Sequence, residues 1–291
     1  MNSKKQKIIN AAYHLFINKG YNATSIQDIL DEAGVSKGTF YNYFTSKTEC
    51  LIAIMDSIGS EIRQKRMAAA VGKPIGDLDV LAEQLCIRIQ LNREKNLFAL
   101  YESIFYSQDE VLKKFARETY ITEMNLISTR IIDVFGEQAK PYALDNAAIV
   151  HGATQQLIHL WKIASPDDLP TQKLSTFVMK RLKTSITEQI KQDERFIPES
   201  NLPFAEPLPE TTPEQLSNEL RTLLHEEEDL DAQELIIFLA DELTAENPRL
   251  ALMESALATL SNNNSYENKL IMALEQVWKT LQSHKKRQSH N

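Results

Sequence analysis

Apolar residues recur along most of the chain at intervals of three and four, which is the spacing of one face of an α-helix. In the first such segment Ile8, Ala12, Leu15 and Phe16 form a single apolar stripe. Glycine is scarce, with 8 residues in 291. The pattern therefore predicts an all-α protein.

Hydroxyl side chains that can cap helices divide the first fifty residues into four helical segments. The predicted capping residues are Ser3, Thr24, Ser36 and Ser46. Three of them open capping boxes, at 3–6, 24–27 and 46–49, and Gly34 is predicted to end the second helix. The third helix is predicted from Lys37 to Phe44, and the fourth runs towards Ala70.

The second and third of these segments form a predicted helix-turn-helix, a motif whose second helix enters the major groove of DNA. Val35, Phe40 and Phe44 are expected to face inward, while Gly38 leaves room for close approach to a duplex. The outward positions carry donors suited to phosphate and base edges: Lys37, Thr39, Tyr41, Asn42 and Tyr43. A helix-turn-helix is also a common structural corner, so this pattern alone leaves both interpretations open.

Charge is distributed unevenly along the chain. Residues 1–66 hold 9 Lys/Arg and 6 Asp/Glu, a net of +3, whereas residues 196–291 hold 7 and 17, a net of -10. A mildly basic N-terminal segment is compatible with a polyanionic partner but does not by itself decide for DNA.

The order of residues through this segment resembles the N-terminal domain of TetR-family transcriptional regulators. The resemblance is carried by IINAAYHLFINKGYNATSIQDILDEAGVSKGTFYNYFTSKTECL, about the first fifth of the chain. It implies an all-helical homodimer with two DNA-binding heads, a palindromic operator and a body that senses a small molecule. The DNA-contacting set that it implies is Thr24, Ser25, Ser36, Lys37, Gly38, Thr39, Tyr41, Asn42, Tyr43 and Lys47.

Residues 49–195 are predicted to form the effector-binding and dimerisation body behind a DNA-binding domain at 1–48. Its candidate effector-binding residues are Phe98, Tyr101, Phe105, Phe115, Tyr120, Met124, His151 and Gln155. The alternative is that these side chains form ordinary core. His151, Gln155 and His159 share a helix face, but glutamine is a poor metal ligand and no carboxylate or cysteine completes a set, so no metal is predicted.

In the resembling family the last two body helices build the dimer interface, which here implies 144–161 and 172–190. The candidate interface residues are Leu157, Trp161, Phe177 and Leu182. The alternative is a monomeric pair of core helices.

The chain continues past this body. Residues 196–213 hold five of the 10 prolines and are predicted to be an extended linker. Thr212-Pro-Glu-Gln215 then starts an additional acidic helical module, predicted over 214–291, whose partner the pattern does not specify.

Enzyme motifs are missing from the sequence: there is no G-x-G-x-x-G, P-loop, G-x-S-x-G or H-E-x-x-H, and no cofactor is predicted. The longest apolar run, 235–240, is far shorter than a membrane span, and no signal peptide is present, so a cytoplasmic protein is predicted.

The sequence therefore favours a DNA-binding regulator, most simply a repressor released by a small, largely apolar effector. An activator of the same family, or a helical interaction adaptor, remains the alternative.

Overall fold

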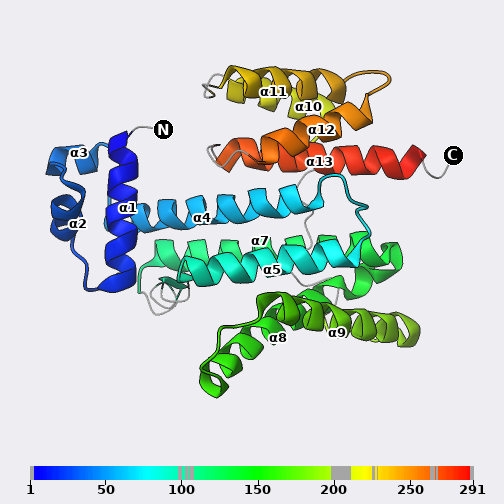
Figure 1. Ribbon diagram of the computed structural model, residues 1–291, viewed down its shortest axis with the longest axis horizontal. Helices are drawn as coiled ribbons and strands as arrows, with labels where there is room; N and C mark the ends of the chain where they lie inside the picture. The colour runs from blue at the N-terminus through cyan, green and yellow to red at the C-terminus, as the bar shows by residue number, and fades with distance from the viewer. Residues whose placement is uncertain are drawn as a thin grey trace. The chain divides into compact units, whose positions relative to one another are not determined.

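The computed structural model describes residues 3–97, 100–101, 104, 108–197, 211–224, 227, 229–262, 266 and 268–288. The protein is all-helical, as predicted (Figure 1). Its helices are α1 (Ser3–Asn18), α2 (Ile26–Ala33), α3 (Lys37–Tyr41), α4 (Lys47–Ala70), α5 (Leu78–Glu94), α7 (Glu110–Phe135), the short 3₁₀ helix η1 (Glu137–Tyr142), α8 (Ala143–Ala164), α9 (Thr171–Gln192), α10 (Pro213–Leu223), α11 (Leu230–Leu243), α12 (Leu250–Ser261) and α13 (Asn268–Gln288).

The chain divides into two compact units, and the long helices α4, α5 and α7 contribute to both. The first unit comprises Met1–Gly59 and Arg88–Glu123, and the second comprises Ser60–Ile87 and Met124–Asn291. The predicted linker lies mostly at 198–210, outside the described residues.

The N-terminal helices of the first unit pack around the predicted apolar stripe. Ile8, Ala12 and Phe16 of α1 are buried, and the Phe16 ring meets the Tyr21 ring edge-on with a centroid separation of 5.2 Å. Phe40 of α3 is also fully buried. Phe40 is the buried residue of α3, and the other positions of this helix are exposed or partly exposed to solvent.

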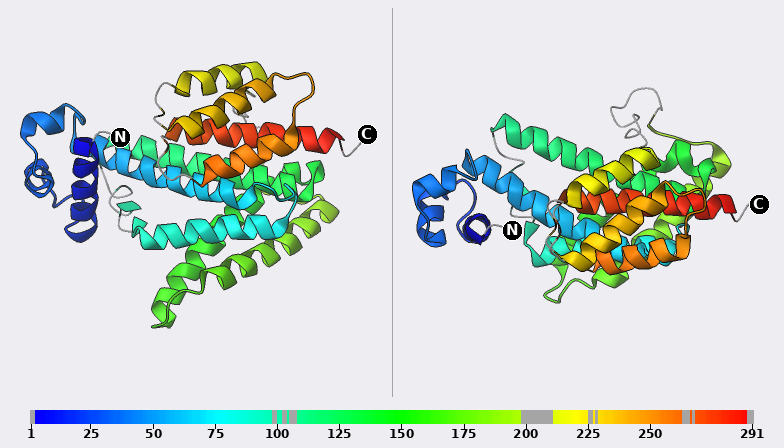
Figure 2. Two further views of the ribbon diagram at one scale, coloured as in Figure 1. Left: turned by 45° about the horizontal axis from the view of Figure 1, so that its top comes forward. Right: turned by 90° about the horizontal axis from the view of Figure 1, so that it is seen from above.

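The second unit contains an α8–α9 pair and the C-terminal helices α10–α13. In α9 Leu174, Val178, Leu182 and Ile186 are all buried, and their spacing of three and four residues makes them one stripe of a helix that packs against a neighbour. Figure 2 shows α11, α12 and α13 adjacent in both views, and α10 contacts α11 and α13.

The C-terminal helices share a hydrophobic core with the second half of α4 and the start of α5. Met67 and Ala70 of α4 and Val80 of α5 belong to the same buried cluster as Leu220, Leu274 and their neighbours in α10–α13. The cluster therefore joins residues that are about two hundred positions apart in the chain.

Local side-chain contacts fix the ends of the C-terminal helices. Thr212 and Gln215 form the predicted capping box with Pro213 as the first helical residue. The Glu242 carboxylate accepts hydrogen bonds from the Arg249 Nε at 2.9 Å and Nη2 at 2.6 Å, which holds the turn between α11 and α12. No helix among the described residues has the length and apolarity needed to cross a membrane.

Candidate nucleic-acid interface

The turn between α2 and α3 has the geometry that the sequence predicts. Gly34 adopts a left-handed conformation with φ of 62°, and its amide donates to the Leu30 carbonyl, which ends α2. Ser36 then caps α3, because its hydroxyl oxygen accepts from the Thr39 amide at 3.1 Å. The helix is shorter than predicted: it ends at Tyr41 with Asn42 as its C-cap rather than continuing to Phe44.

The face of α3 opposite Phe40 is a polar surface. Ser36, Lys37, Gly38 and Asn42 are exposed, and Tyr41 is 45% exposed with the Lys37 ammonium 6.0 Å from the centre of its ring. The partly exposed members are Thr39 and Tyr43. The structure thus brings these predicted contact residues together on α3 and on the residues that flank it.

The start of α2 requires a correction at Thr24. The helix is capped by Ser25, which forms a capping box with Asp28, and not by Thr24 with Gln27. Thr24 is 1% exposed, and its hydroxyl donates to the Gly20 carbonyl at 2.8 Å. Its side chain is therefore directed into the protein, whereas the neighbouring Ser25 is exposed. Gln27, also exposed in the first turn of α2, is absent from the predicted contact set.

Lys47 occupies a structural position rather than a freely exposed one. Its ammonium donates to the carbonyls of Tyr21 and Thr24, each at 2.8 Å, and lies 4.3 Å from the centre of the Tyr21 ring. Desolvation by burial lowers the pKa of Lys47, and the Asp28 charge partly opposes that shift. These contacts tie the start of α4 to the loop before α2.

Asp28 completes the cap of α2 as an anion. Its carboxylate accepts from the Lys19 ammonium at 2.8 Å and from the Ser25 amide at 2.7 Å. The hydrogen bond from Lys19, followed by those from Ser25, holds the pKa of Asp28 well below its usual range.

We expect Asp28→Asn to lower the melting temperature at neutral pH. The folded-state pKa of Asp28 is depressed, so its contribution is present above the unfolded value near 3.9 and is lost as the pH falls through the folded value. The difference in melting temperature between wild type and variant should therefore shrink in thermal melts below about pH 4. Asp31→Asn makes the same charge change in the same helix and is the control; an equal pH-dependent loss there would contradict the assignment.

A hydrogen-bonded path leads from the N-terminal helices to the start of α7 within the first unit. The Tyr21 hydroxyl lies 3.1 Å from Thr48 Oγ1, and Thr48 donates to Asp109 Oδ2 at 2.7 Å. This bond from Thr48 is the main cause of a lowered Asp109 pKa. On α1, the Tyr13 hydroxyl donates to the Lys95 carbonyl at 3.0 Å. Directional contacts thus connect α1 and the start of α4 to the end of α5 and the start of α7.

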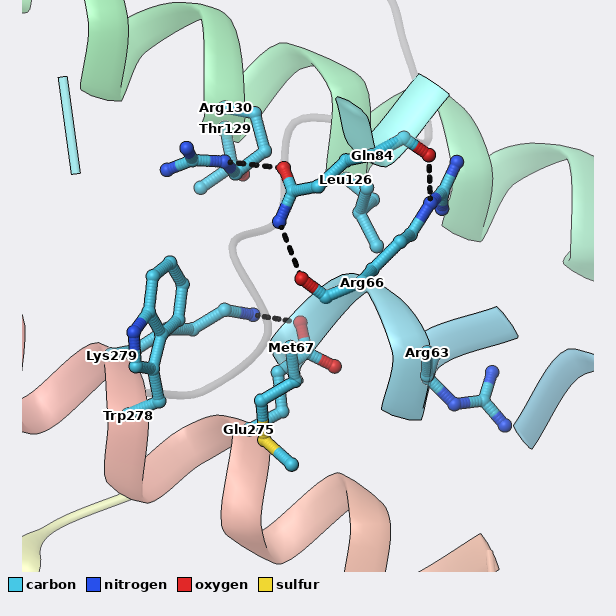
Figure 3. A pocket seen from close by; sticks show the side chains of 10 residues that line it. All are labelled: Arg63, Arg66, Met67, Gln84, Leu126, Thr129, Arg130, Glu275, Trp278 and Lys279. Atoms are coloured by element: carbon cyan, nitrogen blue, oxygen red, sulfur yellow. Dashed lines mark hydrogen bonds and ion pairs between the residues drawn. The ribbon is translucent and has the colours of Figure 1, made fainter. Parts of the chain in front are cut away.

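The predicted effector residues have different environments. Met124 is buried, Tyr120 is exposed, and Tyr101, Phe115, His151 and Gln155 are partly buried. Phe98 and Phe105 lie outside the described residues. A cavity in the second unit, lined by residues of α4, α5, α7 and α13, includes none of this set (Figure 3).

The predicted dimer residues also separate by environment. Leu182 is 1% exposed and belongs to the buried stripe of α9, so its side chain packs inside the protomer instead of against a second chain. Leu157 and Trp161 are partly buried, and Phe177 is exposed. The largest exposed apolar side chains of α8 are Ile149, Leu160 and Ile163. Their spacing of eleven and three places them on one helix face.

A capped helix-turn-helix with an exposed polar second helix defines this chain as a DNA-binding protein of the helix-turn-helix class. Residues 8–54 match the model of bacterial regulatory proteins of the tetR family. The HTH-type transcriptional regulator YerO of Bacillus subtilis is 25% identical over 280 residues, which cover 94% of this chain and 95% of that protein. The chain is a TetR-family transcriptional regulator with an N-terminal helix-turn-helix domain.

Two further comparisons cover large parts of other proteins. The HTH-type transcriptional repressor DhaR of Mycobacterium sp. is 22% identical over 215 residues, covering 74% of this chain and 96% of that one. The crystal structure of a Mesorhizobium loti protein assigned to the TetR family has a TM-score of 0.50 at 19% identity. It covers 64% of this chain and 96% of its own. That structure supports the fold alone, and the family is one of regulators rather than enzymes.

Proposed function

We propose that the protein is a homodimeric repressor that binds a palindromic operator through α3 and is released by a small, largely apolar effector. The observation that carries the DNA-binding part is the exposed face of Lys37, Tyr41 and Asn42 around the buried Phe40. Lysine neutralises phosphate and the hydroxyl and amide groups orient the helix in the groove. The repressor assignment is supported by the similarity to DhaR, which carries that name.

The exposed apolar stripe of α8 supports assembly as a dimer. Ile149, Leu160 and Ile163 present branched side chains to solvent on one face, an arrangement that monomeric surfaces usually avoid. A second copy related by a two-fold axis would cover the same stripe with itself. The two α3 helices would then address half-sites about one helical turn of DNA apart.

Release by an effector requires that the body alter the placement of α3. The contacts of Thr48 with Asp109 and of Tyr13 with Lys95 connect the N-terminal helices to α7 and α5. An effector that binds one arrangement of these helices better than another shifts the population by its differential affinity, and DNA affinity falls when the favoured spacing no longer matches the half-sites.

Lys37→Ala and Tyr43→Ala should each weaken binding to an operator selected from genomic fragments. Losing one lysine–phosphate contact in each protomer of Lys37→Ala should also flatten the salt dependence, by about 0.9 in log-log slope for each contact, whereas Tyr43→Ala removes no charge and should lower the affinity without changing the slope. Mobility-shift titrations at several salt concentrations measure both effects. Lys114→Ala, which removes the same charge from an exposed position of α7, is the control. Wild-type affinity and slope in both α3 variants would rule out this face as the interface.

A further inference from the structure

The two carboxylate oxygens of Asp109 serve two different helices. Oδ1 accepts from the backbone amide of Val111 at 2.8 Å and so caps the first turn of α7. Oδ2 accepts from the hydroxyl of Thr48, in the first turn of α4, at 2.7 Å. These residues all belong to the first compact unit. One short side chain therefore joins the N-terminal turns of two helices whose bonded residues are 61 positions apart in the chain.

The hydrogen atoms fix the direction of the bonds around Thr48. A threonine hydroxyl carries one hydrogen, and an ionised carboxylate can only accept, so the hydrogen of Thr48 points to Asp109. The Tyr21 hydroxyl, 3.1 Å from Thr48 Oγ1, is then the donor of the second bond. The result is a chain that runs from Tyr21 through Thr48 to Asp109, in which each bond polarises the next.

Tyr21 brings this chain of bonds into the N-terminal helices. The residue is 6% exposed, and its ring packs edge-on against Phe16 of α1. The Lys47 ammonium lies over the same ring and donates to the carbonyls of Tyr21 and Thr24. Thr24 directly precedes Ser25, the N-cap of α2. A displacement of the Tyr21 hydroxyl therefore acts on the loop from which α2 of the helix-turn-helix begins.

The other end of the chain of bonds is fixed by packing in the first turn of α7. Leu112 is fully buried there, whereas Val111 beside it is 57% exposed. The amides of this turn are bonded to the Asp109 carboxylate, so the carboxylate follows the position of the turn. A ligand that moves the first turn of α7 thus moves the acceptor on which Thr48 depends.

The two bonds together require a short side chain with two acceptor oxygens. Asparagine can cap a helix with its one carbonyl oxygen, but it then presents an NH₂ group instead of an acceptor to Thr48. Serine and threonine cap with a single oxygen. Aspartate meets both demands at once, and the bond from Thr48 is the main cause of its lowered pKa.

We propose that Asp109 is the positioning residue that makes the placement of the helix-turn-helix depend on the first turn of α7. The inference rests on the proposed function for its consequence, which is release from DNA, and it names the contact through which that release passes. Its main test measures hydrogen exchange without DNA, so the inference and the proposed function can fail separately.

Thr48→Val keeps the shape of the side chain and removes both bonds, whereas Thr48→Ser keeps the hydroxyl. Hydrogen exchange followed by mass spectrometry should show that amides of α2 and α3 exchange about tenfold faster in Thr48→Val, because a hydrogen bond to a charged group is lost. The rates in Thr48→Ser should stay within about twofold of wild type, and those of α8 and α9 should not change in either variant. Thr122→Val is the control, since this exposed hydroxyl of α7 bonds only the Glu118 carbonyl of its own helix among the described residues.

Asp109→Asn tests the same contact from α7, because it preserves a capping oxygen and weakens the bond to Thr48. It should speed exchange in α2 and α3 and lower operator affinity several-fold in mobility-shift titrations. Glu110→Gln removes the same charge from the next residue, which is exposed and paired with Lys113, and should change neither. The double variant Thr48→Val/Asp109→Asn should be no worse than Thr48→Val alone, because both substitutions break one chain of bonds.

Three results would overturn the proposal. The first is wild-type exchange in α2 and α3 of Thr48→Val, and the second is a Thr48→Ser protein that behaves as Thr48→Val does. The third is a double variant whose effects are the sum of the single ones. A wild-type protein that binds no operator would contradict the proposed function only, because the exchange rates would still decide whether Asp109 positions the helix-turn-helix.

Discussion

Removal of residues 198–291 should leave a protein that aggregates instead of a folded regulator. Met67, Ala70 and Val80 are 3%, 1% and 2% exposed because α10–α13 cover them, and truncation would expose this apolar face. Size-exclusion chromatography and thermal melts of residues 1–197 test the prediction. A chain that ends after Gln288, the last residue of α13, is the control and should behave as wild type.

Point substitutions in the full-length chain test whether α10–α13 share one core with α4 and α5 or fold as an independent domain. Leu274 is fully buried in this core, whereas Met272 of the same helix is 50% exposed. Leu274→Ala should reduce the free energy of unfolding by about 2–5 kcal/mol, and Met272→Ala should change it by less than about 0.5 kcal/mol. Met67→Ala, on α4, should lower the same unfolding transition as Leu274→Ala. Either of two results would contradict the shared core. One is a 1–197 fragment that is soluble and monodisperse, and the other is a protein with two unfolding transitions, of which Leu274→Ala lowers one and Met67→Ala lowers the other.

Leu160→Glu should convert the proposed dimer into a monomer and abolish tight operator binding. Leu160 is 58% exposed in the protomer, so the substitution leaves its fold intact, but a two-fold interface would bury two uncompensated carboxylates. A monomer has a single DNA-binding domain and loses the gain from bivalent binding, so its affinity for a palindromic operator should fall by about 10²-fold or more.

The matched control is Leu230→Glu, the same change at a leucine that is 73% exposed in the first turn of α11. It should preserve both the mass measured by light scattering and the operator affinity. Melting curves confirm that each variant is folded. A Leu160→Glu protein that remains dimeric and binds with wild-type affinity would exclude the α8 stripe as the interface.

Local chemistry explains why the N-terminal prediction succeeded in large part. Ser36 caps α3 and Gly34 ends α2 because both effects depend on neighbours within a few residues. The box of Thr212 and Gln215 was predictable for the same reason. Thr24 stood one residue before an equally good cap, and hydrogen bonds from its hydroxyl to the carbonyls of Gly20 and Leu15 hold its side chain in the interior.

The sequence by itself therefore determined the helical class, most helix starts, and a polar surface on a helix-turn-helix with its family. The tertiary structure decided which partner each apolar stripe faces, because a 3.6-residue period defines a buried face but not what covers it. Leu182 is buried inside the protomer, and Leu274 shares a core with Met67. The cavity in the second unit could not be predicted either, since Arg66, Arg130 and Trp278 come from three helices and meet only when the chain folds.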